Sequence, residues 1–252
     1  MFCRYISIAA LFLLVCLSTQ VYAFDFSAWD TILKKNTRPS TYMGIGYAGF
    51  DYAAILKSGE FDKLLAGLES FSPAELRGRD EALAFWINVY NIFAVKLVRD
   101  YFPVAGIREA GGIFSPAWIV PAGMVGGKMY TLHEIEHEIL RPMNEPAIHF
   151  AIVCASISCP DLRAEAYTAP ALKEQLRSQI SRLLENREKG MRVDREKKTV
   201  YLSMLFKWYE KDFAGAGGGI GFLNCELGGR HNIPLDYVVD YLPYNWYLNT
   251  VR

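Results

Sequence analysis

Nucleophilic side chains are concentrated in one short stretch of the chain, residues 149–160, with the sequence HFAIVCASISCP. Its thiols and hydroxyls belong to Cys154, Ser156, Ser158 and Cys159. The apolar run 150–153 predicts a buried strand over residues 149–154. Thiols and hydroxyls gathered where a buried strand emerges are typical of a nucleophilic site. We therefore predict a site here, with Cys154 as the first candidate nucleophile and Cys159 as the second.

The catalytic partner of Cys154 does not follow from this stretch alone. His149 and Cys154 are five residues apart, and on a regular strand an odd separation places two side chains on opposite faces. We therefore expect the partner of Cys154 to come from elsewhere in the chain. His149 remains a candidate site residue, and its alternative role is that of a hydrogen-bonded core histidine.

A second motif, HEIEH at residues 133–137, has the form His-Glu-x-x-His. On a helix, two such histidines can share one zinc ion while the glutamate activates water. The predicted helix is short, however, over residues 132–140, and Met143 stands where a third histidine would fall in one class of metalloprotease. Asp161 or Glu165 could supply a distant third ligand. We predict no metal and keep a zinc hydrolase, acting through His133, Glu134 and His137, as an alternative.

Residues 81–99 predict a long helix that is apolar on nearly every face, and such a helix belongs at the centre of a domain. Asp80 is its expected N-cap. Asn88 and Asn91 lie three residues apart and therefore share one face. Since buried amides need hydrogen-bond partners, they either tie the core to a neighbouring loop or orient groups in a pocket.

The rest of the chain predicts short helices and hairpins without an internal repeat. Gly44 and Gly46 are read as breaks in a helical region, Thr168 as a helix cap, and the glycine run 215–219 as a flexible loop without the Gly-Lys-Ser/Thr ending of a phosphate-binding loop. We predict no cofactor. The fold class is α+β, with a helical N-terminal part and the long central helix packed on a mainly antiparallel sheet. Further helices are expected at 26–35, 52–57, 60–71, 170–186 and around 206–213, hairpins at 113–131 and 191–203, and a closing strand at 238–248.

The N-terminal residues predict export. Arg4 is the only charge before Asp25, residues 6–18 are almost wholly apolar, and Val21-Tyr22-Ala23 resembles a signal-peptide cleavage site. We predict a signal peptide over residues 1–23 and a single periplasmic or secreted domain over 24–252. The apolar run is shorter than the ~20 residues that a spanning helix needs, so we expect no membrane span after cleavage.

Charge and cysteine content narrow the function classes. The chain carries 27 Lys+Arg and 27 Asp+Glu, without a basic block, and this gives no reason to expect nucleic-acid binding. Cleavage after residue 23 would leave three cysteines, Cys154, Cys159 and Cys225. At most one intramolecular disulfide could then form. Both Cys154–Cys159 and Cys159–Cys225 are open alternatives.

Five blocks of the sequence stand out: AFWINVYN (84–91), LHEIEHEILR (132–141), HFAIVCASISCPDL (149–162), FKWYEKDF (206–213) and YLPYNWYLN (241–249). In this order they resemble domain-of-unknown-function family 547. The resemblance spans about residues 50–250 and implies a domain of exported bacterial proteins, and of plant proteins with coiled-coil segments, without a settled activity. The family usually carries Asp at the positions of His133 and Asn245. His133 therefore departs from the family, which indicates that the zinc motif arises here by coincidence. At position 245, any chemistry that needed a carboxylate would be weakened in this chain.

The resemblance also singles out Glu136 and His137, because the family block contains Ile-Glu-His. A neutral imidazole held by a carboxylate or an amide is a suitable base for a thiol nucleophile. His137 is thus the best candidate base for Cys154, oriented by Glu136 or by one of the two asparagines. The alternative is a histidine that caps an element or packs beneath the sheet.

Two functions follow as hypotheses. The first is a binding domain whose Cys/His-lined site takes a small-molecule, peptide or cell-envelope ligand, with Asn88, Asn91, Ser156 and Ser158 in supporting roles. The second is a cysteine-dependent hydrolase or acyltransferase acting on peptide- or amide-type bonds, similar in spirit to papain-like and transglutaminase-like enzymes. The central helix carries no cysteine at its start, however, which separates the chain from those enzymes. A free thiol of low pKa in a cleft would favour the second hypothesis.

Aromatic residues form a further group, Trp208, Tyr209, Tyr244 and Trp246. They could line a groove for a sugar or a peptide, but aromatic residues at this density more commonly fill a core or cover a sheet.

Overall fold

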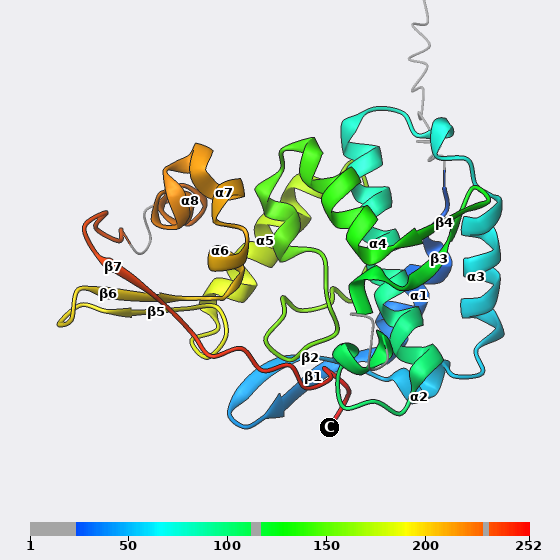
Figure 1. Ribbon diagram of the computed structural model, residues 1–252, viewed down its shortest axis with the longest axis horizontal. Helices are drawn as coiled ribbons and strands as arrows, with labels where there is room; N and C mark the ends of the chain where they lie inside the picture. The colour runs from blue at the N-terminus through cyan, green and yellow to red at the C-terminus, as the bar shows by residue number, and fades with distance from the viewer. Residues whose placement is uncertain (1–23, 112–116, 229–231) are drawn as a thin grey trace, which may run out of the picture.

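A computed structural model describes residues 24–111, 117–228 and 232–252 (Figure 1). The predicted signal peptide, residues 1–23, lies outside the described residues. The fold class is α+β, as predicted, with helices that surround one central helix. The described residues form three small sheets in place of the single sheet that we expected.

The long helix α4 (Arg79–Tyr101) forms the centre of the domain, and every residue from 83 to 95 is buried. By length and composition α4 could cross a membrane, but 83% of its most apolar window is buried inside the domain. The helix begins earlier than predicted, because Gly78 is its N-cap and Asp80 lies in the first turn. An acidic side chain in that turn still complements the positive end of the helix dipole.

The N-terminal part contains the predicted helices α1 (Ser27–Asn36), α2 (Tyr52–Ile55) and α3 (Gly59–Ser70). Between α1 and α2, where we expected only glycine breaks, lies the antiparallel hairpin β1 (Thr37–Tyr42) and β2 (Ile45–Phe50). Met43 and Gly44 form its two-residue turn with φ of 51° and 81°, and positive φ at both positions is what such hairpins require.

The expected strand at residues 149–154 is wrong. Residues 146–150 form the short helix η6 (Pro146–Phe150), and the following apolar residues run through the core without a strand partner. Their backbone is bonded by side-chain amides: Val153 donates its N–H to Asn91, and Phe150 accepts from Gln179. A short apolar run does not by itself distinguish a strand from another buried segment. Because these residues form no strand, the expectation that His149 and Cys154 lie on opposite faces of one is also wrong.

Two of the three sheets are antiparallel hairpins, β1–β2 and β3 (Pro121–Val125) with β4 (Lys128–Thr131). The third sheet joins β5 (Met191–Asp194) and β6 (Thr199–Leu202) as the predicted hairpin and adds β7 (Val238–Tyr241) parallel to β6. The closing strand is therefore shorter than predicted. After β7 the chain leaves this sheet and runs to the β1–β2 hairpin, the red segment in Figure 1.

Other boundaries also differ from the prediction. Helix α8 begins inside the glycine run expected to be a loop, and α5 begins at Leu172 with Ala171, not Thr168, as its N-cap. Of the expected hairpin at 113–131, residues 117–119 form a short helix and residues 112–116 lie outside the described residues. The remaining elements are η1 (Pro73–Glu75), η2 (Ile107–Gly111), η3 (Ala117–Ile119), the π-helix η4 (Glu134–Leu140), η5 (Arg141–Met143), α5 (Leu172–Glu185), α6 (Leu205–Trp208), α7 (Glu210–Phe213), η7 (Ala214–Ala216) and α8 (Gly218–Glu226).

Candidate functional site

One cavity of about 410 Å³ collects most of the predicted site residues. Its polar lining includes Cys154, Cys159, Glu136, His133, His137 and His149. Its apolar walls include Tyr90, Trp118, Trp208, Tyr209, Tyr244 and Trp246. The aromatic group thus borders a cavity in this chain. A cavity of this size with largely apolar walls and a few converging polar groups is typical of small-molecule sites.

The sulfur of Cys154 is the most heavily hydrogen-bonded group of the cavity. Its Sγ lies 3.2 Å from Sγ of Cys159, 3.2 Å from Oγ of Ser156 and 3.3 Å from the Tyr244 hydroxyl. The hydrogen bond between the two sulfurs, with help from Ser156 and Tyr244, outweighs burial and lowers the pKa of Cys154 to about 7. Burial instead raises the pKa of Cys159. Cys154 is half-buried, Cys159 is buried, and the described cysteines, including the exposed Cys225, are free thiols.

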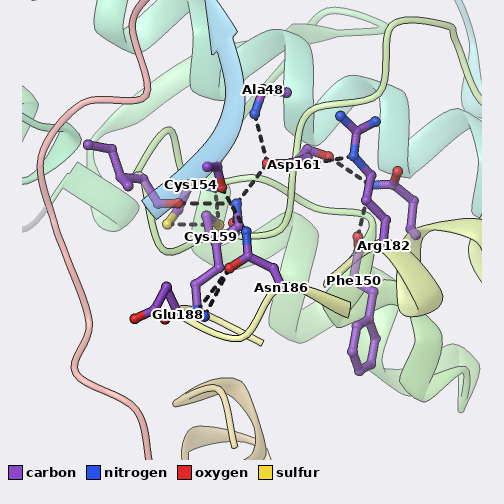
Figure 2. A network of polar contacts seen from close by, with 12 residues as sticks. Ala48, Phe150, Cys154, Cys159, Asp161, Arg182, Asn186 and Glu188 are labelled. Atoms are coloured by element: carbon purple, nitrogen blue, oxygen red, sulfur yellow. Dashed lines mark hydrogen bonds and ion pairs between the residues drawn. The ribbon is translucent and has the colours of Figure 1, made fainter. Parts of the chain in front are cut away.

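A buried cation, Lys189, holds the loop that carries both thiols. Figure 2 shows the polar network around Asp161, with Ala48, Arg182 and both thiols labelled. Lys189 Nζ donates to the carbonyl oxygens of Ile157 at 3.2 Å and Cys159 at 2.9 Å, and to Oδ1 of Asp161 at 2.7 Å. Asp161 also accepts from the Ala48 N–H and from Arg182. Burial alone would raise the pKa of Asp161, but Lys189, the Ala48 N–H and Arg182 together lower it. Asp161 is therefore ionised and balances the buried ammonium group.

Asn88 and Asn91 tie helix α4 to two loops. Asn91 accepts from the Val153 N–H at 2.8 Å and donates to the Ala151 carbonyl at 3.0 Å, directly before Cys154. Asn88 makes the same pair of bonds to the backbone of Tyr167 alone. Asn91 thus braces the thiol loop, whereas Asn88 braces a different loop.

The C-terminal segment 244–249 also contacts the thiol loop, in addition to Lys189 and Asn91. Ser158 Oγ accepts from the Asn245 N–H at 2.8 Å, and the Ile157 N–H donates to the Tyr247 carbonyl at 2.9 Å. The side chain of Asn245 accepts from the Tyr247 N–H. An aspartate could accept this bond equally well, so the departure from the family at position 245 is compatible with the same turn.

His149 has its protonation fixed by an acidic partner. Its Nε2 lies 2.8 Å from Oδ2 of Asp212, and the pKa of Asp212 is lowered to about 2, chiefly by the hydrogen bond from Arg141. An ionised carboxylate only accepts hydrogen bonds, so Nε2 of His149 carries the proton. Burial lowers the pKa of His149 to about 4. The ring is therefore neutral, and its buried Nδ1 is an acceptor without a partner among the described residues.

His137 has the opposite tautomer. Arg141 Nη1 lies 2.7 Å from Nδ1 of His137, and a guanidinium group only donates, so Nδ1 accepts and the proton sits on Nε2. Burial, followed by the charges of His133 and Arg141, lowers the pKa of His137. Neither nitrogen of this neutral ring is free to accept a proton. This is not the arrangement of a general base for Cys154, which is the role that we assigned to His137.

Glu136 is a buried carboxyl group on the cavity wall, only 3% exposed. Its Oε2 lies 3.3 Å from the Tyr90 hydroxyl, and its Oε1 has no hydrogen-bond partner among the described residues. Burial raises its pKa more than the hydroxyls of Tyr209 and Tyr90 lower it. Two buried polar atoms beside the cavity, Oε1 of Glu136 and Nδ1 of His149, thus have no hydrogen-bond partner among the described residues, although His137 Nε2 lies 3.9 Å from Oε1 of Glu136.

The His-Glu-x-x-His motif serves a structural purpose at the start of η4. Glu134 accepts from the Thr131 N–H at 2.8 Å, and Thr131 Oγ1 accepts from the Glu134 N–H at 3.0 Å. This reciprocal pair is a capping box, and it occupies the carboxylate that a zinc enzyme would use on water. The rings of His133 and His137 lie 4.4 Å apart. Within residues 24–111, 117–228 and 232–252, no group of three His, Cys, Asp or Glu side chains is placed to hold a metal.

Neutral His149 makes stability depend on pH in the acidic range. Its pKa is about 4 in the folded protein against 6.5 ordinarily, so the unfolded chain takes up the proton first as the pH falls. The contribution of neutral His149 to the free energy of unfolding is complete above pH 6.5. It decreases as the pH falls toward 4, by about 3 kcal/mol in total. Urea unfolding at the two pH values should therefore show a steeper loss for the wild type than for His149→Gln. Equal losses would show that His149 is not buried in the neutral form.

Together these features define an α+β domain with a thiol-bearing cavity between the centre of the domain and its C-terminal segment. Residues 73–184 match the model of the family described as "Protein of unknown function, DUF547", and this part of the chain belongs to that family. The match confirms the resemblance, although it covers less than the range 50–250 that we expected. No curated protein and no solved structure matches the chain.

Several residues of the site were not singled out in the sequence. Tyr244 was noted only as part of an aromatic group, while Arg141, Asp212 and Lys189 were not considered as site residues. Arg141, Asp212 and Tyr244 lie in the blocks that carry the family resemblance, and that was the available signal. Lys189 lies outside those blocks, and an isolated lysine in the sequence does not indicate burial.

Proposed function

We propose that the domain is a cysteine-dependent hydrolase or acyltransferase acting on amide-type bonds, with the Cys154 thiolate as the nucleophile. The observation that carries the proposal is the sulfur of the half-buried residue Cys154 on the wall of an aromatic cavity, bonded by three neighbours and with a pKa of about 7. Thiolates are the reactive form of cysteine. The N-terminal sequence supports an exported location for this activity.

The chemistry can be assigned to groups that share the cavity. The thiolate attacks the carbonyl carbon, the C–N bond breaks, the amine leaves with a proton, and a thioester remains on Cys154 until water or a second nucleophile displaces the thiolate. The Tyr244 hydroxyl lies 3.3 Å from the sulfur and stays protonated because burial raises its pKa. We assign it to the carbonyl oxygen, where negative charge develops.

Further roles can be assigned to the buried polar groups beside the cavity. Glu136, whose raised pKa favours the protonated carboxyl group, would supply the proton of the leaving amine. His149, oriented by Asp212 and with Nδ1 unoccupied, would accept the proton of the incoming water. His137 would donate from Nε2 and orient the acyl group.

A binding domain without chemistry is the second candidate. It is favoured by the surroundings of Cys154: among the described residues, its sulfur has hydrogen bonds to Cys159, Ser156 and Tyr244 but none to a histidine. On this alternative Glu136 and His149 would bind a ligand with one donor and one acceptor, and Cys154 would only line the wall.

The test uses reduced protein and two reagents. Iodoacetamide should modify Cys154 with a rate that rises through a midpoint near pH 7, faster near neutral pH than the exposed Cys225. The activated ester p-nitrophenyl acetate should give a burst of nitrophenolate and an acetyl group on Cys154, located by peptide mass. Cys154→Ser should abolish the burst, and Cys225→Ser should leave it unchanged. If Cys154 reacts no faster than Cys225 and no acetyl group forms, the binding domain becomes the better account.

A further inference from the structure

We propose that Cys154 and Cys159 also form a reactive dithiol, which exchanges with small-molecule disulfides and closes into an intramolecular disulfide. The inference goes beyond acyl chemistry, because it depends on the second sulfur and not on a carbonyl substrate. Its basis is the 3.2 Å separation of the two sulfur atoms on the wall of one cavity.

The loop between the two residues brings the sulfurs together. Ala155 has a left-handed backbone with φ of 59°, and the Cys154 N–H donates to Sγ of Cys159 at 3.1 Å. A disulfide bond is about 2.0 Å long, so the sulfurs must approach by roughly a further ångström. Lys189 holds the loop by the carbonyls of Ile157 and Cys159, not by either thiol. The movement therefore leaves the contacts of Lys189 in place, and it changes only the hydrogen bonds of the two sulfurs.

The two thiols differ in the way that a reactive dithiol requires. Cys154 is half-buried, whereas Cys159 is buried, so an incoming disulfide meets Cys154 first. The lowered pKa of Cys154 and the raised pKa of Cys159 have the same consequence, because the thiolate is the attacking species. Cys159 is then placed to attack only after Cys154 has reacted.

The exchange balances without a further reactant. The Cys154 thiolate attacks one sulfur of the disulfide RSSR, a mixed disulfide forms, and RS⁻ leaves. Cys159 gives its proton to the released thiolate and attacks Sγ of Cys154, so that the mixed disulfide breaks and the second R group leaves as RS⁻, which takes up the proton that Cys154 released to water on ionising. Two electrons pass from the dithiol to RSSR, which is reduced to two RSH. The cavity volume of about 410 Å³ suits a small disulfide.

The experiment uses glutathione disulfide as the probe and the reduced protein of residues 24–252 with the Cys225→Ser substitution, so that Cys154 and Cys159 are its only cysteines. The protein with both site cysteines should lose two alkylatable thiols and retain almost no glutathione adduct by intact mass. Addition of Cys159→Ser should convert nearly all of the reacted protein to a stable adduct on Cys154. Addition of Cys154→Ser should prevent the reaction.

Three results would overturn the inference: an adduct that persists while Cys159 is present, no reaction at all, or a Cys154–Cys159 bridge that dithiothreitol does not reduce in the folded protein. The acyl probe separates this outcome from the fate of the proposed function. Acetylation of Cys154 without disulfide closure removes only the dithiol inference, whereas closure without acetylation removes only the acyl chemistry.

Discussion

Replacement of Lys189 by methionine is expected to lower the free energy of unfolding by about 3–5 kcal/mol. The Lys189 side chain is 2% exposed, and removal of its ammonium group leaves the carboxylate of Asp161 without its closest partner and two buried carbonyl groups without a donor. Methionine is unbranched and one heavy atom shorter than lysine, so the loss reports the charge and the hydrogen bonds more than the volume. Urea unfolding monitored by tryptophan fluorescence measures the change.

Arg182 provides a matched control for this prediction. It is the second cation on Asp161, at 2.8 Å, but its side chain is 48% exposed. An exposed ion pair contributes up to about 1 kcal/mol, so Arg182→Met should cost far less than Lys189→Met. Equal losses for the two variants would show that burial of Lys189 does not decide the stability of this loop.

Asn91→Ala is expected to cost about 2–4 kcal/mol, because the Val153 N–H and the Ala151 carbonyl then lose their partner inside the core. We expect a second effect on the site, since the backbone before Cys154 is no longer held. The alkylation rate of Cys154 near neutral pH should fall in the variant that remains folded. Urea unfolding and iodoacetamide labelling under native conditions measure the two effects.

Asn88→Ala separates stability from site geometry. It removes the same amide from the same helix, with equivalent bonds to Tyr167, and should therefore cost a similar free energy of unfolding. The alkylation rate of Cys154 should stay close to that of the wild type. If both variants slow Cys154 equally, the loss reports general loosening of the core and not the brace made by Asn91.

The sequence was sufficient for features that depend on long apolar patterns or on the family blocks. The apolar pattern predicted the long helix α4 and its central position, because apolar side chains occur on nearly every face of that helix. The family blocks drew attention to Glu136 and His137, and these two residues line the same cavity as Cys154, Cys159 and His149. The α+β class followed from the order of helices and hairpins.

The sequence failed where side chains replace the usual backbone partners. A strand over 149–154 was a reasonable expectation for an apolar run, but Asn91 and Gln179 supply the hydrogen bonds that a neighbouring strand would give. Tautomers were also out of reach, because they depend on Arg141 and Asp212, and Asp212 is more than sixty residues away from the histidine that it bonds. The burial of Lys189 depends on a loop thirty residues earlier.

Because segment 244–249 forms part of the site, the site can be completed only late in the synthesis of the chain. The thiol loop is synthesised some ninety residues before Tyr244, whose hydroxyl bonds Cys154, and before Asn249, whose N–H donates to the carbonyl of Ala155. During translation, the central helix and both thiols are therefore made before segment 244–249, which completes the site. The pocket closes only when the chain has been made as far as residue 249, so a nascent or truncated chain would present the thiols without the wall that covers them.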